Sequence, residues 1–174
     1  MKKILALVLA LSLCLTMTAA MAEAVDSKTT ANLVYTNSTE IIVAPAAPTE
    51  KAVLDIVTAA ASAPVVTLLD TKVQEAVAAK LPATVDAKTL KIDECFTLAA
   101  TATTVAGEQK LTVTSAVKYD TKANVVVLAY VNGEWVVLDT EIVDGELVVT
   151  LPDDVVAQMA TGAELTTMIL SDAQ

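Results

Sequence analysis

The candidate chemical groups of this chain are one cysteine, several carboxylates and an aromatic pair. Cys95 is the candidate thiol nucleophile. A catalytic cysteine usually needs an imidazole, a helix N-terminus or a nearby cation to lower its pKa. The chain contains no histidine, and Asp93 and Glu94 precede the cysteine directly. Adjacent carboxylates disfavour a thiolate, so we interpret Cys95 as a structural thiol, with an intermolecular disulfide as the alternative.

Paired carboxylates are the second candidate group. Asp139 and Glu141 lie two residues apart and therefore share a strand face. Asp153 and Asp154 open a helical turn, where acids have a capping role. Pairs of this kind occur in glycoside hydrolysis and in Ca²⁺ binding. With 21 acidic residues in the chain, however, such pairs arise by chance, which makes an acid-based hydrolase the least favoured function.

Several enzyme classes are excluded by composition. A Ser-His-Asp triad needs a histidine, a zinc site needs several Cys or His, and a phosphate-binding loop needs closely spaced glycines. The chain has no histidine, two cysteines and four glycines. We therefore expect a non-enzymatic protein with no catalytic residues, no cofactor and no bound metal.

The aromatic pair follows from a hairpin signal. A two-residue Asn132-Gly133 loop places Tyr130 opposite Trp135. Such a cross-strand pair stabilises a hairpin, and we expect it to be covered by helices. The alternative is an exposed patch in which Tyr130 and Trp135, with Asp139 and Glu141 nearby, bind a glycan or a protein.

The acidic composition limits the partners. The net charge is −10 with 11 lysines and no arginine. Nucleic-acid binding and adsorption to anionic lipid both rely on a basic surface. We expect neither. The partner class that remains is a protein or a glycan outside the cell, and the sequence does not identify it.

The first 22 residues have the pattern of an export signal. Lys2 and Lys3 precede an apolar run from Ile4 to Leu15, and Ala20 and Ala22 offer a cleavage site. The run is too short to span a bilayer. Leu13 before Cys14 departs from a lipidation motif. We expect a secreted protein, extracellular or loosely associated with the envelope, whose mature chain carries a charge of −12 and does not insert into a membrane.

The remaining chain divides into three predicted segments. Residues 23–47 form a leader with short strands, 48–82 a helical segment and 83–174 an antiparallel β module. In the helical segment Val53, Ile56, Val57 and Ala60 share one helix face, capped by Thr49 and stopped by Pro64. A second helix starts at Asp70, carries Val73, Val77 and Leu81 on one face, and ends before Pro82.

The β module shows a period of two. Leu90, Ile92, Phe96 and Leu98 fall on one side, and Glu94 interrupts that side at an edge or a bulge. Asn132-Gly133 and Asp144-Gly145 predict two tight hairpins. Their pairing predicts an apolar core face of Val125, Val127, Ala129, Val136, Leu138, Ile142, Leu147, Val149 and Leu151. The fold class expected is mainly β: an antiparallel, immunoglobulin-like β-sandwich preceded by a short helical pair. The alternative is an α+β roll with the helices packed on one sheet face.

Three stretches carry a family resemblance: "LPATVDAKTLKIDECFTL", "VVVLAYVNGEWVVLDTEIVDGELVVTLP" and "ELTTMILSD". They resemble small uncharacterised secreted proteins of gut-type Gram-positive bacteria and the immunoglobulin-like modules of bacterial surface proteins. The resemblance implies a secreted β module and supplies no catalytic residues. We therefore expect a structural or interaction role at the bacterial cell surface, with a carbohydrate-binding module as the alternative.

Overall fold

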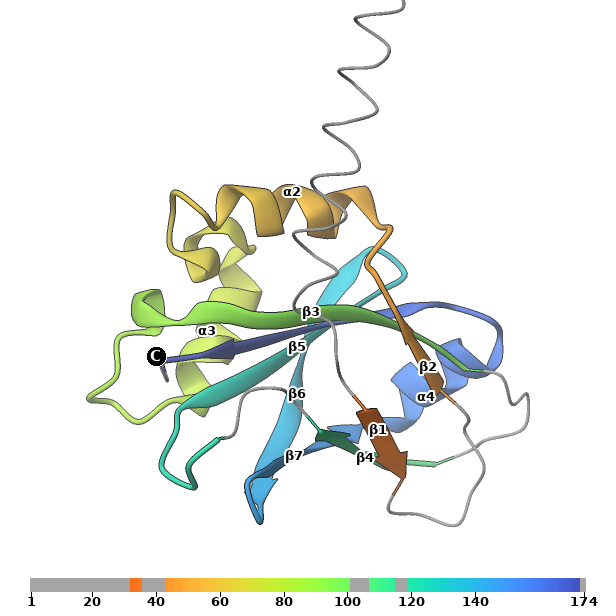
Figure 1. Ribbon diagram of the computed structural model, residues 1–174. Helices are drawn as coiled ribbons and strands as arrows, with labels where there is room; N and C mark the ends of the chain where they lie inside the picture. The colour runs from red at the N-terminus through yellow and green to blue at the C-terminus, as the bar shows by residue number, and fades with distance from the viewer. Residues whose placement is uncertain (1–31, 36–42, 101–106, 115–118, 173–174) are drawn as a thin grey trace, which may run out of the picture.

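A computed structural model describes residues 32–35, 43–100, 107–114 and 119–172 (Figure 1). The predicted signal peptide, Cys14 and residues 23–31 lie outside the described residues. The helices are α2 (Lys51–Ala59), α3 (Thr71–Lys80) and α4 (Asp153–Ala160), with the 3₁₀ turns η1 (Val65–Leu68) and η2 (Ala87–Thr89). The strands are β1 (Asn32–Tyr35), β2 (Val43–Ala46), β3 (Lys91–Ala100), β4 (Gln109–Thr114), β5 (Val125–Val131), β6 (Glu134–Val143), β7 (Glu146–Leu151) and β8 (Leu165–Ser171).

The helix boundaries follow local chemistry. Asp70 caps α3 by accepting a hydrogen bond from the Val73 N–H at 3.0 Å, and α3 ends at Lys80, just before Pro82. At the start of α2 the prediction was wrong. Glu50, and not Thr49, is the N-terminal capping residue, and its side chain makes no capping hydrogen bond. Because α2 is capped by its backbone geometry alone, packing of its apolar face must hold it in place.

The described strands pair antiparallel in the order β1-β4-β7-β6-β5-β8-β3-β2. Both hairpins are confirmed: Asn132 and Asp144 have φ of 50° and 53°, and each is followed by a glycine with positive φ. These are the angles of type I′ turns. The pairing of Tyr130 with Trp135 is confirmed as well.

Strand β6 connects two parts of a curled sheet. Its first half pairs with β5 as far as Val127–Leu138, whereas continuing the register of the Asn132-Gly133 turn predicts one further pair, Val126 with Asp139. From Asp139 onward its partner is β7. The mainly β, antiparallel architecture is thus confirmed. A β-sandwich is not: the sheet curls into a half-barrel. Alternating strands bury one face in either arrangement, so the sequence pattern does not distinguish them.

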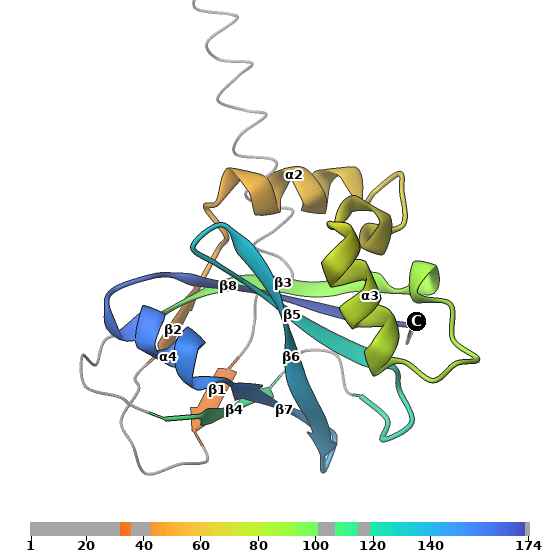
Figure 2. The ribbon, with the colours of Figure 1, turned by 180° about the vertical axis from the view of Figure 1, so that it is seen from behind.

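Two apolar clusters lie on opposite faces of this sheet. The inner cluster fills the half-barrel and includes Val155, Val156 and Met159 of α4. It also contains all nine residues of the predicted core face, six of them buried and Val125, Val136 and Ile142 partly buried. The outer cluster joins β3, β5, β6 and β8 to α2, η1 and α3. Figure 2 shows α2 and α3 lying on this outer side of the sheet.

A bulge in β3 decides which residues face each cluster. The register with β8 shifts between Ile92 and Glu94. Phe96 and Leu98 therefore belong to the inner cluster, whereas Ile92 and Cys95 pack on the outer one. The prediction that Leu90 and Ile92 share a face with Phe96 was wrong, because one inserted residue reverses the alternation.

The bulge residue itself is held by hydrogen bonds. The carboxylate of Asp93 is buried and accepts hydrogen bonds from the Tyr119 hydroxyl at 3.1 Å and from the Ser171 hydroxyl. A buried carboxylate is costly unless it is hydrogen-bonded. The two hydroxyls meet that requirement and fix the position at which β3 changes register.

Candidate functional site

The predicted aromatic pair lies on the outer face of the sheet. The ring centroids of Tyr130 and Trp135 are 5.0 Å apart, with the ring planes tilted by 52°. Both side chains are partly buried and pack against the cluster that α2, η1 and α3 contribute to. The helical segment therefore covers part of this face, and the rings contact the protein's own side chains.

The predicted acidic residues continue along β6 on the same face. Asp139 and Glu141 are exposed. Asp139 forms an ion pair with Lys80 at the end of α3, and its side chain is 75 % exposed. Exposed ion pairs contribute little to stability, about 0 to 1 kcal/mol. The contact marks the point at which α3 meets β6.

The four predicted site residues do not converge on one hollow. Asp139 lies four positions after Trp135 along β6, which corresponds to about 13 Å. None of the four lines the pocket described next. Strand alternation places all four on one face, but of the four only Tyr130 and Trp135 are in contact with each other.

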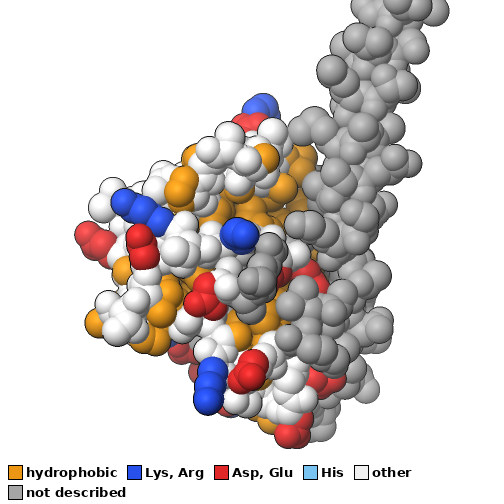
Figure 3. All heavy atoms as spheres, turned by 60° about the vertical axis from the view of Figure 1, so that its left-hand side comes forward, with side chains coloured by type: hydrophobic (Ala, Val, Ile, Leu, Met, Phe, Trp, Pro, Cys, Tyr) orange, Lys and Arg blue, Asp and Glu red, His pale blue; other side chains and the backbone are white. Residues whose placement is uncertain are grey.

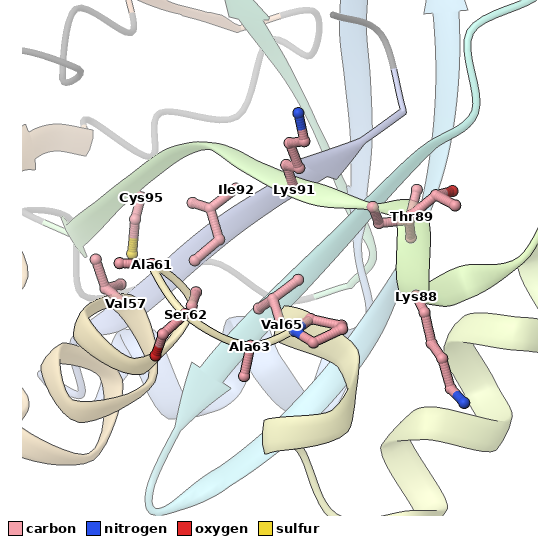
Figure 4. Close-up of a pocket in the computed structure, with 13 residues that line it drawn as sticks. Val57, Ala61, Ser62, Ala63, Val65, Lys88, Thr89, Lys91, Ile92 and Cys95 are labelled. Carbon is pink, nitrogen blue, oxygen red and sulfur yellow. The ribbon is translucent and has the colours of Figure 1, made fainter.

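A pocket of about 930 Å³ lies between the end of α2 and the start of β3. Its lining residues are Val57, 60–65, 88–92 and Cys95. Figure 4 shows the turn after α2 on one side of the pocket and β3 on the other. Figure 3 shows hydrophobic side chains at the surface near lysine side chains on one face of the molecule.

Short side chains create this hollow. The chain after α2 reads Ala60, Ala61, Ser62 and Ala63 before Pro64. Methyl and hydroxymethyl groups fill little space, so the turn passes over β3 without closing the gap to Ile92 and Cys95. The run of small residues was visible in the sequence, but what lies opposite it depends on the tertiary fold.

Cys95 lies at one end of the pocket. Burial raises the pKa of the Cys95 thiol from 9.0 to about 12, so the sulfur is protonated near neutral pH. The physical cause is desolvation, and not the carboxylates that neighbour it in sequence. Asp93 is hydrogen-bonded to Tyr119 and Ser171 instead. A neutral thiol serves here as part of an apolar wall.

Lys88 and Lys91 line the other end of the pocket. Both side chains are exposed, and they come from η2 and the first residue of β3. Among the residues that the structure describes, no aspartate or glutamate lines the pocket, although the chain carries a net charge of −10. The pocket is therefore an apolar hollow with two lysines at its rim, whose side chains extend in different directions (Figure 4). Sequence reasoning missed this feature.

Two further features concern metals and membranes. Within the described parts of the chain, no group of three or more His, Cys, Asp or Glu is placed to hold a metal ion. No helix in those same parts is both long and apolar enough to cross a bilayer.

Compared with known proteins, the chain matches no protein-family model, no curated protein and no solved structure.

Proposed function

We propose that this protein is a secreted, non-enzymatic β module that acts at the bacterial cell surface by binding a partner. The pocket between α2 and β3 carries this proposal. Binding sites are typically concave, about 300 to 1,000 Å³ in volume, mostly apolar, and supplied with a few polar groups that orient the ligand. The volume of about 930 Å³, the aliphatic walls and the two lysines fit that description.

The chemistry of the pocket favours binding over catalysis. Its thiol is protonated because burial raises the pKa of Cys95 to about 12. No histidine exists in the chain to act as a base, and none of the described pocket residues is a carboxylate. Nucleophilic catalysis by cysteine requires a thiolate or an adjacent base. The lining offers apolar contact and positive charge instead.

Export is supported by the N-terminal pattern of Lys2 and Lys3, an apolar run and the alanines before Glu23. The full chain expressed in a Gram-positive host should appear in the culture medium beginning at Glu23, as measured by intact mass. A full-length product that stays with the cell membrane would overturn this part of the proposal.

The partner-binding role is tested with a pocket-filling variant. Ala61 is exposed and lines the pocket, so Ala61→Trp should fill it without disturbing the buried clusters. Ala79→Trp on the exposed side of α3 is the matched control. Labelled wild type and Ala79→Trp should bind to washed cells of the encoding bacterium and sediment with them, whereas Ala61→Trp should remain in solution. Equal sedimentation of the two variants would show that the pocket is not the binding surface.

The carbohydrate-binding alternative depends on Tyr130 and Trp135. Their rings pack against each other and against the outer cluster, which favours a structural role for the pair.

A further inference from the structure

The wall that β3 contributes to the pocket contains residues from both sides of the bulge. Ile92 comes before the bulge and Cys95 after it, and both extend from β3 toward the turn that follows α2 (Figure 4). In a regular strand, residues three positions apart point to opposite faces. Leu90 and Ile92 therefore share the pocket with Cys95 only because one extra residue lies between them.

Asp93 is that extra residue. Leu170 and Ile169 are consecutive in β8, and they pair with Ile92 and Glu94 of β3. The register assigns no residue of β8 to Asp93, which lies between these two. Because a bulge re-aims the side chains of its strand, the position of the extra residue decides which side chains of β3 face the pocket.

A bulge one position earlier is opposed by Asp93. In that register Asp93 would lie opposite Leu170, a residue of the outer cluster. Its carboxylate would leave the hydroxyls of Tyr119 and Ser171 for apolar surroundings beside the pocket. A buried carboxylate without hydrogen bonds is far more costly than one that has them, so the two hydroxyls select against this register.

A bulge one position later is opposed by Glu94. In that register Glu94 would lie beside Met168 on the outer face, again within an apolar cluster. At its present position, opposite Ile169, the side chain is 1 % exposed and has an interaction partner. Either one-step move of the bulge would thus place a carboxylate next to a pocket whose described lining contains none.

From this geometry we propose that Asp93 is a positioning residue of the pocket. Its hydrogen bonds on the inner side of the sheet hold the bulge in the one register that brings Leu90, Ile92 and Cys95 together and keeps the β3 wall apolar. The effect on binding rests on the function proposed above, whereas the effect on the wall does not.

The register is measured by nuclear Overhauser contacts between β3 and β8. In Asp93→Val the side chain no longer needs the hydroxyls and suits the outer cluster, so position 93 should replace Ile92 opposite Leu170. Thr97→Val is the matched control. It removes a buried hydrogen bond of 2.9 Å between the same two strands, from the hydroxyl of Thr97 to that of Thr166, and should leave the contact of Ile92 with Leu170 in place.

Three further variants separate positioning from stability. Asp93→Asn retains an acceptor oxygen and should keep the wild-type contacts. A deletion of Asp93 leaves a regular strand in which Ile92 still lies opposite Leu170, so it should keep the wall even though the hydroxyls lose their partner. A purely structural role predicts the opposite, with the deletion as the most damaging change. Ser171→Ala removes one hydroxyl only and should populate the shifted register in part, which keeps the test decisive if Asp93→Val does not fold.

Binding to washed cells of the encoding bacterium is the second readout. Asp93→Val should sediment with the cells about tenfold less than the wild type, because the shifted wall loses aliphatic contact. Thr97→Val and the deletion should sediment as the wild type does. If Ile92 stays opposite Leu170 in both Asp93→Val and Ser171→Ala, the positioning proposal is wrong. If the contacts shift while cell binding is unchanged, the positioning of the wall is supported and the proposed binding function of the pocket fails.

Discussion

Tyr130 and Trp135 lie opposite each other across the β5–β6 hairpin, with ring centroids 5.0 Å apart and the helical segment packed over the same face. The pair links the tight turn at Asn132-Gly133 to the outer cluster. The two rings are held in place by a local hairpin, and they pack against the cluster to which α2 and α3 contribute. Helix α3 ends about 50 residues before Tyr130.

The coupling between these two rings is measurable. Trp135→Ala should destabilise the protein by about 3 kcal/mol, since it removes a large, partly buried side chain. A double-mutant cycle with Tyr130→Ala should give an interaction free energy of about 1 kcal/mol. Urea unfolding of the four proteins provides the values. An interaction free energy near zero would show that the rings are neighbours without energetic coupling.

The first hairpin turn depends on a residue without a side chain. Gly133 has φ of +89° with open space around the position of a Cβ, so Gly133→Ala tests backbone strain alone. We expect a loss of about 1 to 2 kcal/mol, because L residues rarely adopt this conformation. Glu134→Ala, exposed and next in the chain, is the control and should change stability by less than about 0.5 kcal/mol. If Gly133→Ala and Glu134→Ala lower the thermal unfolding temperature equally, the turn is not of type I′.

Helix α4 packs against the inner face of the half-barrel. Met159 is 1 % exposed and packs in the inner cluster. Met159→Ala should cost about 2 to 5 kcal/mol, as large-to-small changes in a core do. Ala157→Ser on the exposed side of the same helix serves as the comparison and should be nearly neutral. If the urea midpoint of unfolding is the same for Met159→Ala and the wild type, α4 does not pack into the half-barrel.

Alkaline pH should weaken the fold through Cys95. Its pKa is raised from 9.0 to about 12 by burial, so the folded protein holds this proton more tightly than the unfolded chain. Stability from this group is complete below pH 9 and is lost as the pH rises from 9 toward about 12. Cys95→Val removes the titration while keeping a small apolar side chain. The difference between the two pH profiles of unfolding free energy isolates the thiol, because the two proteins differ at no other residue. Parallel profiles would mean that Cys95 is solvated.

Local sequence signals predicted the hairpins and the faces of their strands. Asn132-Gly133 and Asp144-Gly145 set the turn type, and the turn type sets the register. From that register the core positions follow by alternation, and all nine predicted residues belong to the inner cluster. The apolar face of α2 was also predicted from the sequence. Its members all belong to the outer cluster or pack against it: Val53, Ile56, Val57 and Ala60.

The β3 strand marks the limit of such reasoning. The sequence indicated an interruption at Glu94, but the bulge lies between Ile92 and Glu94 and places Leu90 and Ile92 on the outer face. A shift of one residue reverses every side chain before it. Its position depends on the hydrogen bonds that Asp93 accepts from Tyr119 and Ser171, which are distant in the chain.

The amino-acid sequence by itself determined the class of structure, the turns, the strand faces and the absence of a histidine-based chemistry, because these depend on residue types and on neighbours a few positions apart. Only the tertiary structure decided that the sheet curls into a half-barrel, that the helices cover the face with Trp135, and that a run of small residues after α2 lies opposite β3. Curvature, coverage and pockets arise from contacts between segments far apart in the chain. The periodicity of a single segment is the same whichever partner it packs against.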